Sequence, residues 1–220
     1  MRRSTHAGFC VRCKLRALLV VVAFCGSGLL AAQQSGFTGR VVVEWVDDSR
    51  FVAQMRLVEE LSFLQARGKT WRVPAGGRVD GRSMSPLFVR ISGSAFDGGF
   101  RKSAVIYDYA TKDMSQPWFE AQRMFFEASL AEGVPPIEAK VMYLLLYTTG
   151  PRWAIQGQSS CFNHCHTSVS ELAWRPLIDD EPVVALVSWV RKNDPSLQEI
   201  DRRARSAILH PGPHIFGYVR

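Results

Sequence analysis

Residues 136–148, with the sequence PIEAKVMYLLLYT, predict the helix around which the rest of this protein packs. A proline in the first turn of a helix is tolerated, and Gly150 with Pro151 stops the helix at its other end. The stretch 141–146 leaves little polar surface on any side of this helix. A helix that is apolar all round is normally buried, so we expect other elements to surround it.

Two further helices are predicted upstream of this one. The first spans about 100–110, and the second opens after Ser115 with Pro117 in its first turn. Apolar residues recur in the second helix at spacings of three and four, so they share one face, and a glutamine lies among them. This face consists of Trp118, Ala121, Gln122, Phe125 and Ser129.

Residues 39–73 predict β-structure. An apolar run at 41–46 is followed, after a polar break, by further segments at 55–63 and 70–73. Several antiparallel strands are the economical arrangement of such short neighbouring segments. Residues 74–99 are dense in Gly, Ser and Pro and predict a surface loop of the kind that also carries binding sites.

The predicted fold class is α+β, with a small antiparallel sheet packed on two or three helices and a helical C-terminal extension. Three parts follow along the chain: a leader at 1–32, the α+β domain at 37–153, and a Cys/His loop with the extension at 154–220. Within the extension, helices are predicted at 182–192 and 196–210. A chain of 220 residues suits one such domain with appendages.

The formal net charge of +7 is concentrated at the N-terminus. Residues 1–32 hold five basic side chains and no acidic ones, which leaves 22 basic and 20 acidic residues in the remainder. So balanced a remainder argues against nucleic acid as a partner. Arg202, Arg203 and Arg205 stand near acidic neighbours, and we interpret them as a solvated helix face.

The leader has the pattern of a secretory signal. A cationic stretch ending at Arg16 precedes the twenty uncharged residues 17–36, and small residues stand at Ala31 and Ala32. We predict export, with cleavage near Ala32 and a periplasmic or secreted product. The alternative is an uncleaved anchor in the inner membrane, because about 20 apolar residues can cross a bilayer.

An ordered series of residues gives the region 37–153 a family resemblance. Its members are Trp71, Val73, Pro74, Ala75, Gly76, Val79, Asp80, Gly81, Ser83, Pro86, Ala104, Val105, Ile106, Asp108, Trp118, Arg123, Met124, Phe125, Phe126, Gly133, Val134, Met142, Tyr143, Gly150, Pro151, Arg152 and Trp153. In that order they resemble the bacterial and phage family called domain of unknown function 1353. This family has no established activity, so the resemblance implies a fold and a region of interest but no reaction.

The chain departs from the family pattern at four positions. Gly77 replaces a phenylalanine and Arg82 an alanine, while Tyr107 and Gln122 stand where members resembling this chain have histidines. Imidazole titrates near neutrality and binds metals, whereas tyrosine titrates near 10 and glutamine does not titrate. The resemblance therefore implies that any acid/base or metal centre of the family is degenerate here.

Asp80, Ser83 and Asp108 remain as the candidate catalytic residues. Two interpretations stay open. In the first, the carboxylates of Asp80 and Asp108 cap and satisfy backbone groups. In the second, the three residues form the polar centre of a hydrolase or of a binding pocket. Catalysis predicts that the three side chains converge in one accessible cleft. We expect a protein that is not an enzyme.

The run Cys161, Phe162, Asn163, His164, Cys165, His166 is the densest group of reactive side chains. In an oxidising compartment, Cys161 and Cys165 predict a disulfide. The alternatives are zinc bound by Cys161, Cys165 and His164 or His166, and covalent haem with His166 as axial ligand, although the spacing is one residue longer than in CxxCH. We therefore assign no cofactor from the sequence.

These observations predict an uncharacterised, exported or membrane-anchored cell-envelope protein. It is expected to be a non-catalytic or degenerate family member that acts in binding or structure, with a cell-envelope component as the expected class of partner. Contact with the membrane would run through the N-terminal segment if that segment is not cleaved. The alternatives are an envelope hydrolase using Asp80, Ser83 and Asp108, and a c-type haem protein.

Overall fold

The computed structural model describes residues 35–46, 54–153 and 175–209. The described residues contain six strands and six helices, which confirms the predicted α+β class. The strands are β1 (Gly36–Thr38), β2 (Val43–Val46), β3 (Gln54–Leu57), β4 (Leu61–Leu64), β5 (Thr70–Val73) and β6 (Arg78–Val79). The helices are α1 (Pro86–Ser92), α2 (Arg101–Asp113), α3 (Trp118–Ala131), α4 (Pro136–Thr149), α5 (Asp180–Asn193) and α6 (Leu197–Ala207).

The strands form two antiparallel sheets of three strands each, where the sequence predicted a single small sheet. Their orders are β1-β4-β5 and β2-β3-β6. The predicted segment 55–63 divides between the sheets, because residues 58–60 separate β3 from β4. Within the first sheet, Phe63 pairs with Phe37 on one side and with Trp71 on the other. Within the second sheet, Met55 pairs with Trp45 and with Val79.

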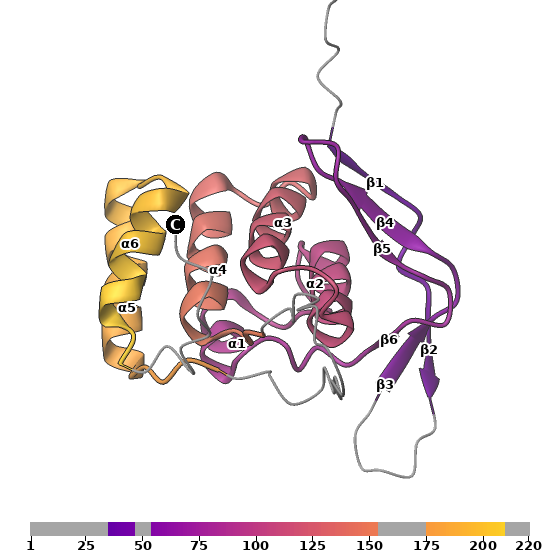
Figure 1. Cartoon of the computed structure of the whole chain (residues 1–220), viewed down its shortest axis with the longest axis horizontal. Helices are drawn as coiled ribbons and strands as arrows, with labels where there is room; N and C mark the ends of the chain where they lie inside the picture. Colours follow the sequence, from indigo (N-terminus) through magenta and orange to yellow (C-terminus); the bar gives the residue numbers. More distant parts are fainter. Residues whose placement is uncertain (1–34, 47–53, 154–174, 210–220) are drawn as a thin grey trace, which may run out of the picture. The chain divides into compact units, whose positions relative to one another are not determined.

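Helix α4 is the buried helix that the sequence predicted. Leu144, Leu145 and Leu146 are each fully buried, although they point in three successive directions around the helix axis. Helices α1, α3, α5 and α6 all contact α4, and Figure 1 shows α3 on one side of it and α5 with α6 on the other. The apolar surface of α4 is thus covered from several sides, as its composition requires.

The C-terminal helices α5 and α6 share the core with the preceding residues. Val183 and Val190 of α5 and Ile200 and Ala204 of α6 are all completely buried. Helix α6 begins with a capping box, in which Ser196 and Glu199 satisfy each other's backbone N–H groups. The predicted helical extension is therefore present and packs on α4.

Helix α1 lies within residues 74–99, where the sequence predicted only a loop. Ser85 caps it by accepting a hydrogen bond from the Phe88 N–H at 3.1 Å, and Pro86 occupies the first helical position. Leu87 and Phe88 are buried, and this tertiary burial stabilises a helix of only seven residues. The expectation of a continuous loop was wrong because capping and burial outweighed the density of turn residues.

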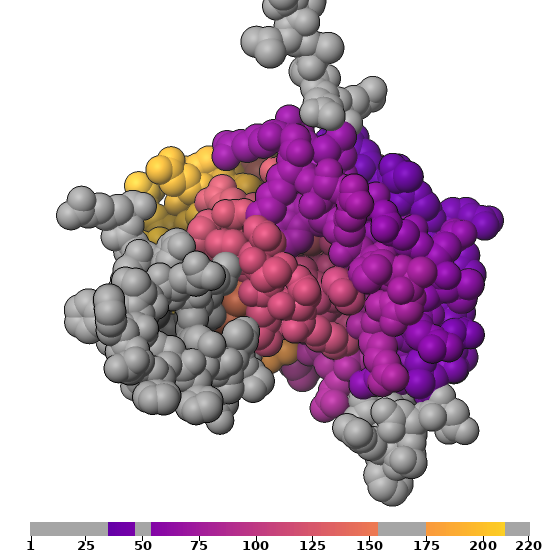
Figure 2. All heavy atoms as spheres, turned by 45° about the vertical axis from the view of Figure 1, so that its right-hand side comes forward, coloured from indigo at the N-terminus to yellow at the C-terminus, as the bar shows by residue number. Residues whose placement is uncertain are grey.

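Helix α2 stands next to the strands and positions the candidate site. It contacts β4, β5 and β6, as well as α3. In the space-filling view the strand residues, coloured indigo to purple, adjoin the helical residues drawn in pink (Figure 2). The N-terminus of α2 is capped by Glu132, the residue directly after α3, whose carboxylate accepts the backbone N–H groups of Lys102 and Ser103, each at 2.8 Å.

Candidate functional site

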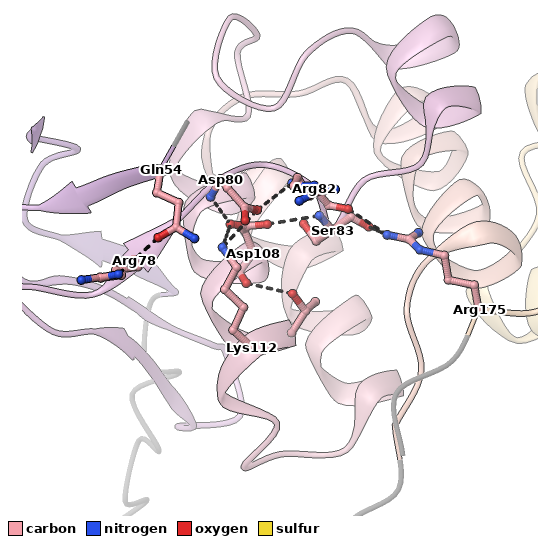
Figure 3. Close-up of polar contacts among 9 residues, drawn as sticks. Gln54, Arg78, Asp80, Arg82, Ser83, Asp108, Lys112 and Arg175 are labelled. Carbon is pink, nitrogen blue, oxygen red and sulfur yellow. Dashed lines mark hydrogen bonds and ion pairs between the residues drawn. The ribbon is translucent and has the colours of Figure 1, made fainter. Parts of the chain in front are cut away.

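The candidate site joins α2 to the loop that follows β6. Asp80 and Ser83 lie in this loop, and Asp108 lies on α2. The structure brings all three together, and Figure 3 shows their contacts. Gly81 has a positive φ of 70°, a conformation that glycine adopts without strain, and it turns the loop back toward α2.

The Asp108 carboxylate holds the loop by accepting three hydrogen bonds. Its Oδ2 accepts the Asp80 N–H at 2.8 Å, and its Oδ1 accepts the Ser83 N–H at 3.2 Å. The Lys112 ammonium donates to Oδ2 at 2.8 Å. Since the Asp108 side chain is only 1% exposed, these bonds compensate the cost of burying its charge.

Asp80 takes part in the same arrangement. Its Oδ1 accepts the backbone N–H of Arg82 at 3.0 Å, which closes a local turn, and lies 3.1 Å from the Lys112 Nζ. The sequence reasoning missed Lys112, although its position four residues after Asp108 on one helix was a signal for this ion pair. Lys112 therefore bridges both carboxylates.

Ser83 is buried, and its backbone groups form the hydrogen bonds that hold the loop in place. Its N–H donates to Asp108, and its carbonyl accepts a hydrogen bond from the Arg175 guanidinium at 3.2 Å. The hydroxyl Oγ has no hydrogen-bond partner among the residues that the structure describes. A serine nucleophile needs an adjacent base, and the described residues place none against this hydroxyl.

Arg175 joins the loop to the C-terminal end of α4. Besides Ser83, its guanidinium donates to the carbonyl of Arg82 at 2.8 Å and to the carbonyl of Thr149 at 2.7 Å. Burial lowers the pKa of Arg175, the effect of taking a cation out of water. Sequence reasoning missed this residue, because more than ninety positions separate it from the loop and no local pattern joins them.

Tyr107, at the first departure from a family histidine, is a core residue. It is completely buried, and its ring packs edge-on against Phe125 with centroids 5.5 Å apart. Burial raises the pKa of the Tyr107 hydroxyl far above its usual value, and the nearby Gln122 amide offsets this only in part. A hydroxyl with so high a pKa remains protonated at neutral pH and does not act as a base.

Gln122, at the second such departure, caps the C-terminal end of α4. It is completely buried, and its Nε2 donates to the carbonyl of Leu146 at 2.9 Å. The same carbonyl also accepts the Gly150 N–H at 2.9 Å, so the amide adds a second hydrogen bond to a carbonyl in the last turn of the helix. The prediction that Gln122 lies on the inward face of its helix is confirmed.

Two arginines complete this capping of α4. Arg152 donates to the carbonyl of Tyr147 at 2.9 Å and stacks over the Trp118 ring at 4.5 Å, while Arg175 donates to Thr149. Cations at a helix C-terminus are favoured by the helix dipole. Gln122, where the resemblance implies a histidine, thus joins Arg152 and Arg175 in donating hydrogen bonds to carbonyls at the end of α4.

The remaining predicted sites lie outside the described residues. These are the leader at 1–32 with its predicted membrane anchor, and the cluster of Cys161, His164, Cys165 and His166. Within the part of the chain that the structure describes, no three His, Cys, Asp or Glu side chains are placed to hold a metal ion. No described helix combines the length and apolarity needed to span a membrane.

Tyr107→Phe is expected to flatten the alkaline decline in stability. Above pH 10 the tyrosine of the unfolded chain ionises while buried Tyr107 stays protonated, so stability falls with rising pH by up to about 1.4 kcal/mol per pH unit. The variant loses this contribution, whereas Tyr143, whose pKa is raised mainly by burial, still contributes. Urea unfolding between pH 8 and 11 measures the difference.

The matched control for this measurement is Tyr109→Phe, because Tyr109 lies on the same helix and is only partly buried. The control should keep the alkaline decline of the parent protein. A Tyr107→Phe variant with the parent's pH profile would contradict the assignment of Tyr107 as a buried, permanently neutral core residue.

Comparisons with known proteins give a match to a family over part of the chain but no activity. Residues 55–146 match the family described as Protein of unknown function (DUF1353). The resemblance found in the sequence is thereby confirmed over a shorter stretch than the expected 37–153. No solved structure matches the chain.

Two curated relatives come from Sinorhizobium fredii (strain NBRC 101917 / NGR234). Uncharacterized protein y4jT is 34% identical over 146 residues, which cover 64% of this chain and 43% of the relative. Uncharacterized protein y4iH is 28% identical over 134 residues, which cover 61% of this chain and 54% of the relative. This chain therefore spans about half the length of the curated relatives that it matches.

Proposed function

We propose that this protein, whose residues 55–146 match a family of unknown function, is a non-catalytic component of the bacterial cell envelope. In this proposal it is exported through its N-terminal segment and acts in binding or structure. The polar centre at Asp80, Ser83 and Asp108 stabilises the fold and carries out no reaction.

The observation that carries the proposal is how the Asp108 carboxylate is used. Two backbone N–H groups and the Lys112 ammonium occupy its two oxygens, and the side chain is 1% exposed. A general acid or base must reach a substrate proton directly or through one water molecule. A buried carboxylate on α2 that is bonded to the backbone of the Asp80 loop is suited to holding that loop against α2.

The two positions that depart from family histidines support the same conclusion. Tyr107 packs on Phe125, and Gln122 caps Leu146, so both side chains serve the core. Neither offers a group that titrates near neutral pH. A metal or acid/base centre that relied on those two positions would lack its working groups in this chain.

Export is supported by the sequence of the leader. Five basic residues and no acidic ones precede the uncharged stretch 17–36. A basic segment followed by an apolar one is typical of secretory signals. The rest of the chain has nearly balanced charge, so the basic residues at the N-terminus have a separate purpose. In the proposal, that purpose is targeting to the membrane.

One preparation tests both parts of the proposal. The full-length chain is expressed in a bacterial host, and we expect it in the periplasmic or membrane fraction, with an intact mass that reports removal or retention of residues 1–32. The recovered protein is then assayed for release of soluble fragments from peptidoglycan and for cleavage of nitrophenyl esters. We expect no turnover above that of Ser83→Ala or Asp80→Asn.

Ser188→Ala serves as the matched control, because Ser188 is exposed on α5 and bonds only to its own helix at Val184. Turnover by the parent protein that is lost in Ser83→Ala but kept in Ser188→Ala would establish the hydrolase instead. Recovery of an unprocessed chain from the cytoplasm alone would contradict the envelope location. These two results are independent, so either part of the proposal can fail separately.

A further inference from the structure

A groove on the outer side of helices α5 and α6 has the composition of an anion-binding site. Its volume is about 530 Å³, and it lies outside the residues matched by the family. Helix α6 contributes most of the lining, while α5 contributes one aromatic side chain; the two helices are neighbours in Figure 1. The lining residues are Trp189, Glu199, Arg202, Arg203 and Ser206.

Arg203 is held in place by the aromatic wall of this groove. Its guanidinium lies over the Trp189 ring, 4.4 Å from the ring centroid. Stacking of this kind is attractive and restricts the long arginine side chain. When the flat face of a guanidinium stacks on a ring, the N–H groups along its edge stay available for hydrogen bonds. Two of these groups match the spacing of two oxygens of a phosphate or carboxylate.

Neither Arg202 nor Arg203 forms an ion pair with any residue in the described parts of the chain. Other exposed arginines do so: Arg191, on the neighbouring helix, donates to Glu138 at 2.9 Å, and Arg56 pairs with Glu44. Arg202 does act on the nearby Glu199 carboxylate, whose pKa it helps to lower, but no hydrogen bond or ion pair of the described residues joins either guanidinium to a carboxylate.

Both acidic residues of α6 already have hydrogen-bond partners. Asp201 accepts hydrogen bonds from Arg123 and from the Tyr143 hydroxyl, each at 2.6 Å, and so turns toward the core. The Glu199 carboxylate accepts the N–H and the hydroxyl of Ser196 in the capping box, and these bonds lower its pKa. Glu199 thus stays charged at neutral pH, and the groove keeps a net charge of +1.

We propose that this groove binds a single phosphate group, carried either by an anionic lipid headgroup or by a small phosphate ester. Arg203 supplies an oriented pair of donors, and Arg202 adds a second cation. The negative charge of Glu199 disfavours a polyphosphate, which would bring several charges next to it. This site uses none of the residues of the Asp80 loop, so it does not depend on whether that loop is catalytic.

The first test compares binding of the full-length protein to vesicles of phosphatidylcholine with and without phosphatidylglycerol. Two variants are matched in charge: R202Q/R203Q in the groove, and R67Q/R72Q on the β4–β5 hairpin, where both arginines are exposed and unpaired among the described residues. We expect R202Q/R203Q to weaken binding to the anionic vesicles about 30-fold, because each basic residue at such a surface contributes roughly fivefold. R67Q/R72Q should bind as the parent does, and the leader, present in all three proteins, cannot produce this difference.

The second test titrates the same proteins with inorganic phosphate and with glycerol 3-phosphate and follows the arginine Nε–H signals by NMR. Saturable shifts that R202Q/R203Q abolishes, without any preference for anionic vesicles, support the site and identify a soluble ester as its ligand. Equal losses of vesicle binding in both double variants, or no saturable shift together with no vesicle preference, would overturn the proposal. Circular dichroism of the variants, all changed at exposed positions, serves as the check that they remain folded.

Discussion

Replacing Asp108 with alanine is expected to lower the free energy of unfolding by about 3 kcal/mol. The change leaves the N–H groups of Asp80 and Ser83 without their acceptor, and an unpaired buried donor costs roughly 1–3 kcal/mol. Lys112 loses its buried partner as well, although it is partly exposed and can turn to water. Urea unfolding at pH 7 measures the loss.

Asp97→Ala is the matched control for this change. Asp97 is exposed and makes no hydrogen bond or ion pair within the described residues, so its replacement should change stability by no more than about 0.5 kcal/mol. Asp108→Asn should fall between the two, because an amide keeps one acceptor oxygen. If Asp108→Ala were as stable as the control, the carboxylate would not be structural, and a catalytic role would regain support.

Replacing Phe125 with alanine is expected to cost about 3–5 kcal/mol, the usual range for a buried phenylalanine. Phe125 is completely buried at the centre of an aromatic cluster, with ring centroids 6.1 Å from Phe88, 6.0 Å from Phe100 and 5.5 Å from Tyr107. The cavity left by the ring removes contacts to α1, to α2 and to the residue that precedes α2. Thermal and urea unfolding both report this loss.

Two comparison variants sharpen the Phe125 experiment. Phe125→Leu retains much of the apolar volume and should cost markedly less than alanine. Val89→Ala removes apolar atoms from a side chain that is 43% exposed, and it should be nearly neutral. A Phe125→Ala variant as stable as Val89→Ala would contradict the position of Phe125 in the core.

Together, Asp108→Ala and Phe125→Ala measure separately how much the polar centre and the aromatic cluster contribute to stability. Phe125 packs beneath Tyr107, and Tyr107 immediately precedes Asp108 on α2. The aromatic cluster therefore positions the helix, and the Asp108 carboxylate then holds the loop. A large loss at both positions would show that the region resembling a family site is, in this chain, a stabilising part of the fold.

The helices were the part of the fold that could be predicted best. Helix α4 was expected at 136–148 and spans Pro136–Thr149, because its composition, its early proline and its terminal glycine all act locally. Helix α1 was missed because its formation depends on the burial of Leu87 and Phe88 by distant residues. The division of the strands into two sheets also depends on contacts between segments, which no short stretch of sequence records.

The sequence by itself determined the α+β class, the helices after residue 100, the buried central helix and the inward position of Gln122, since periodicity, capping and turn residues act over a few positions. It also identified Asp80, Ser83 and Asp108 as one group through the family resemblance. Only the tertiary structure decided how that group is used. Asp108 meets backbone groups 25 and 28 residues away, and Arg175 reaches the same loop across 92 and 93 positions. Contacts over such separations arise from the packing of α2, α4 and the loop, and that packing leaves the Asp108 carboxylate buried and hydrogen-bonded to the loop.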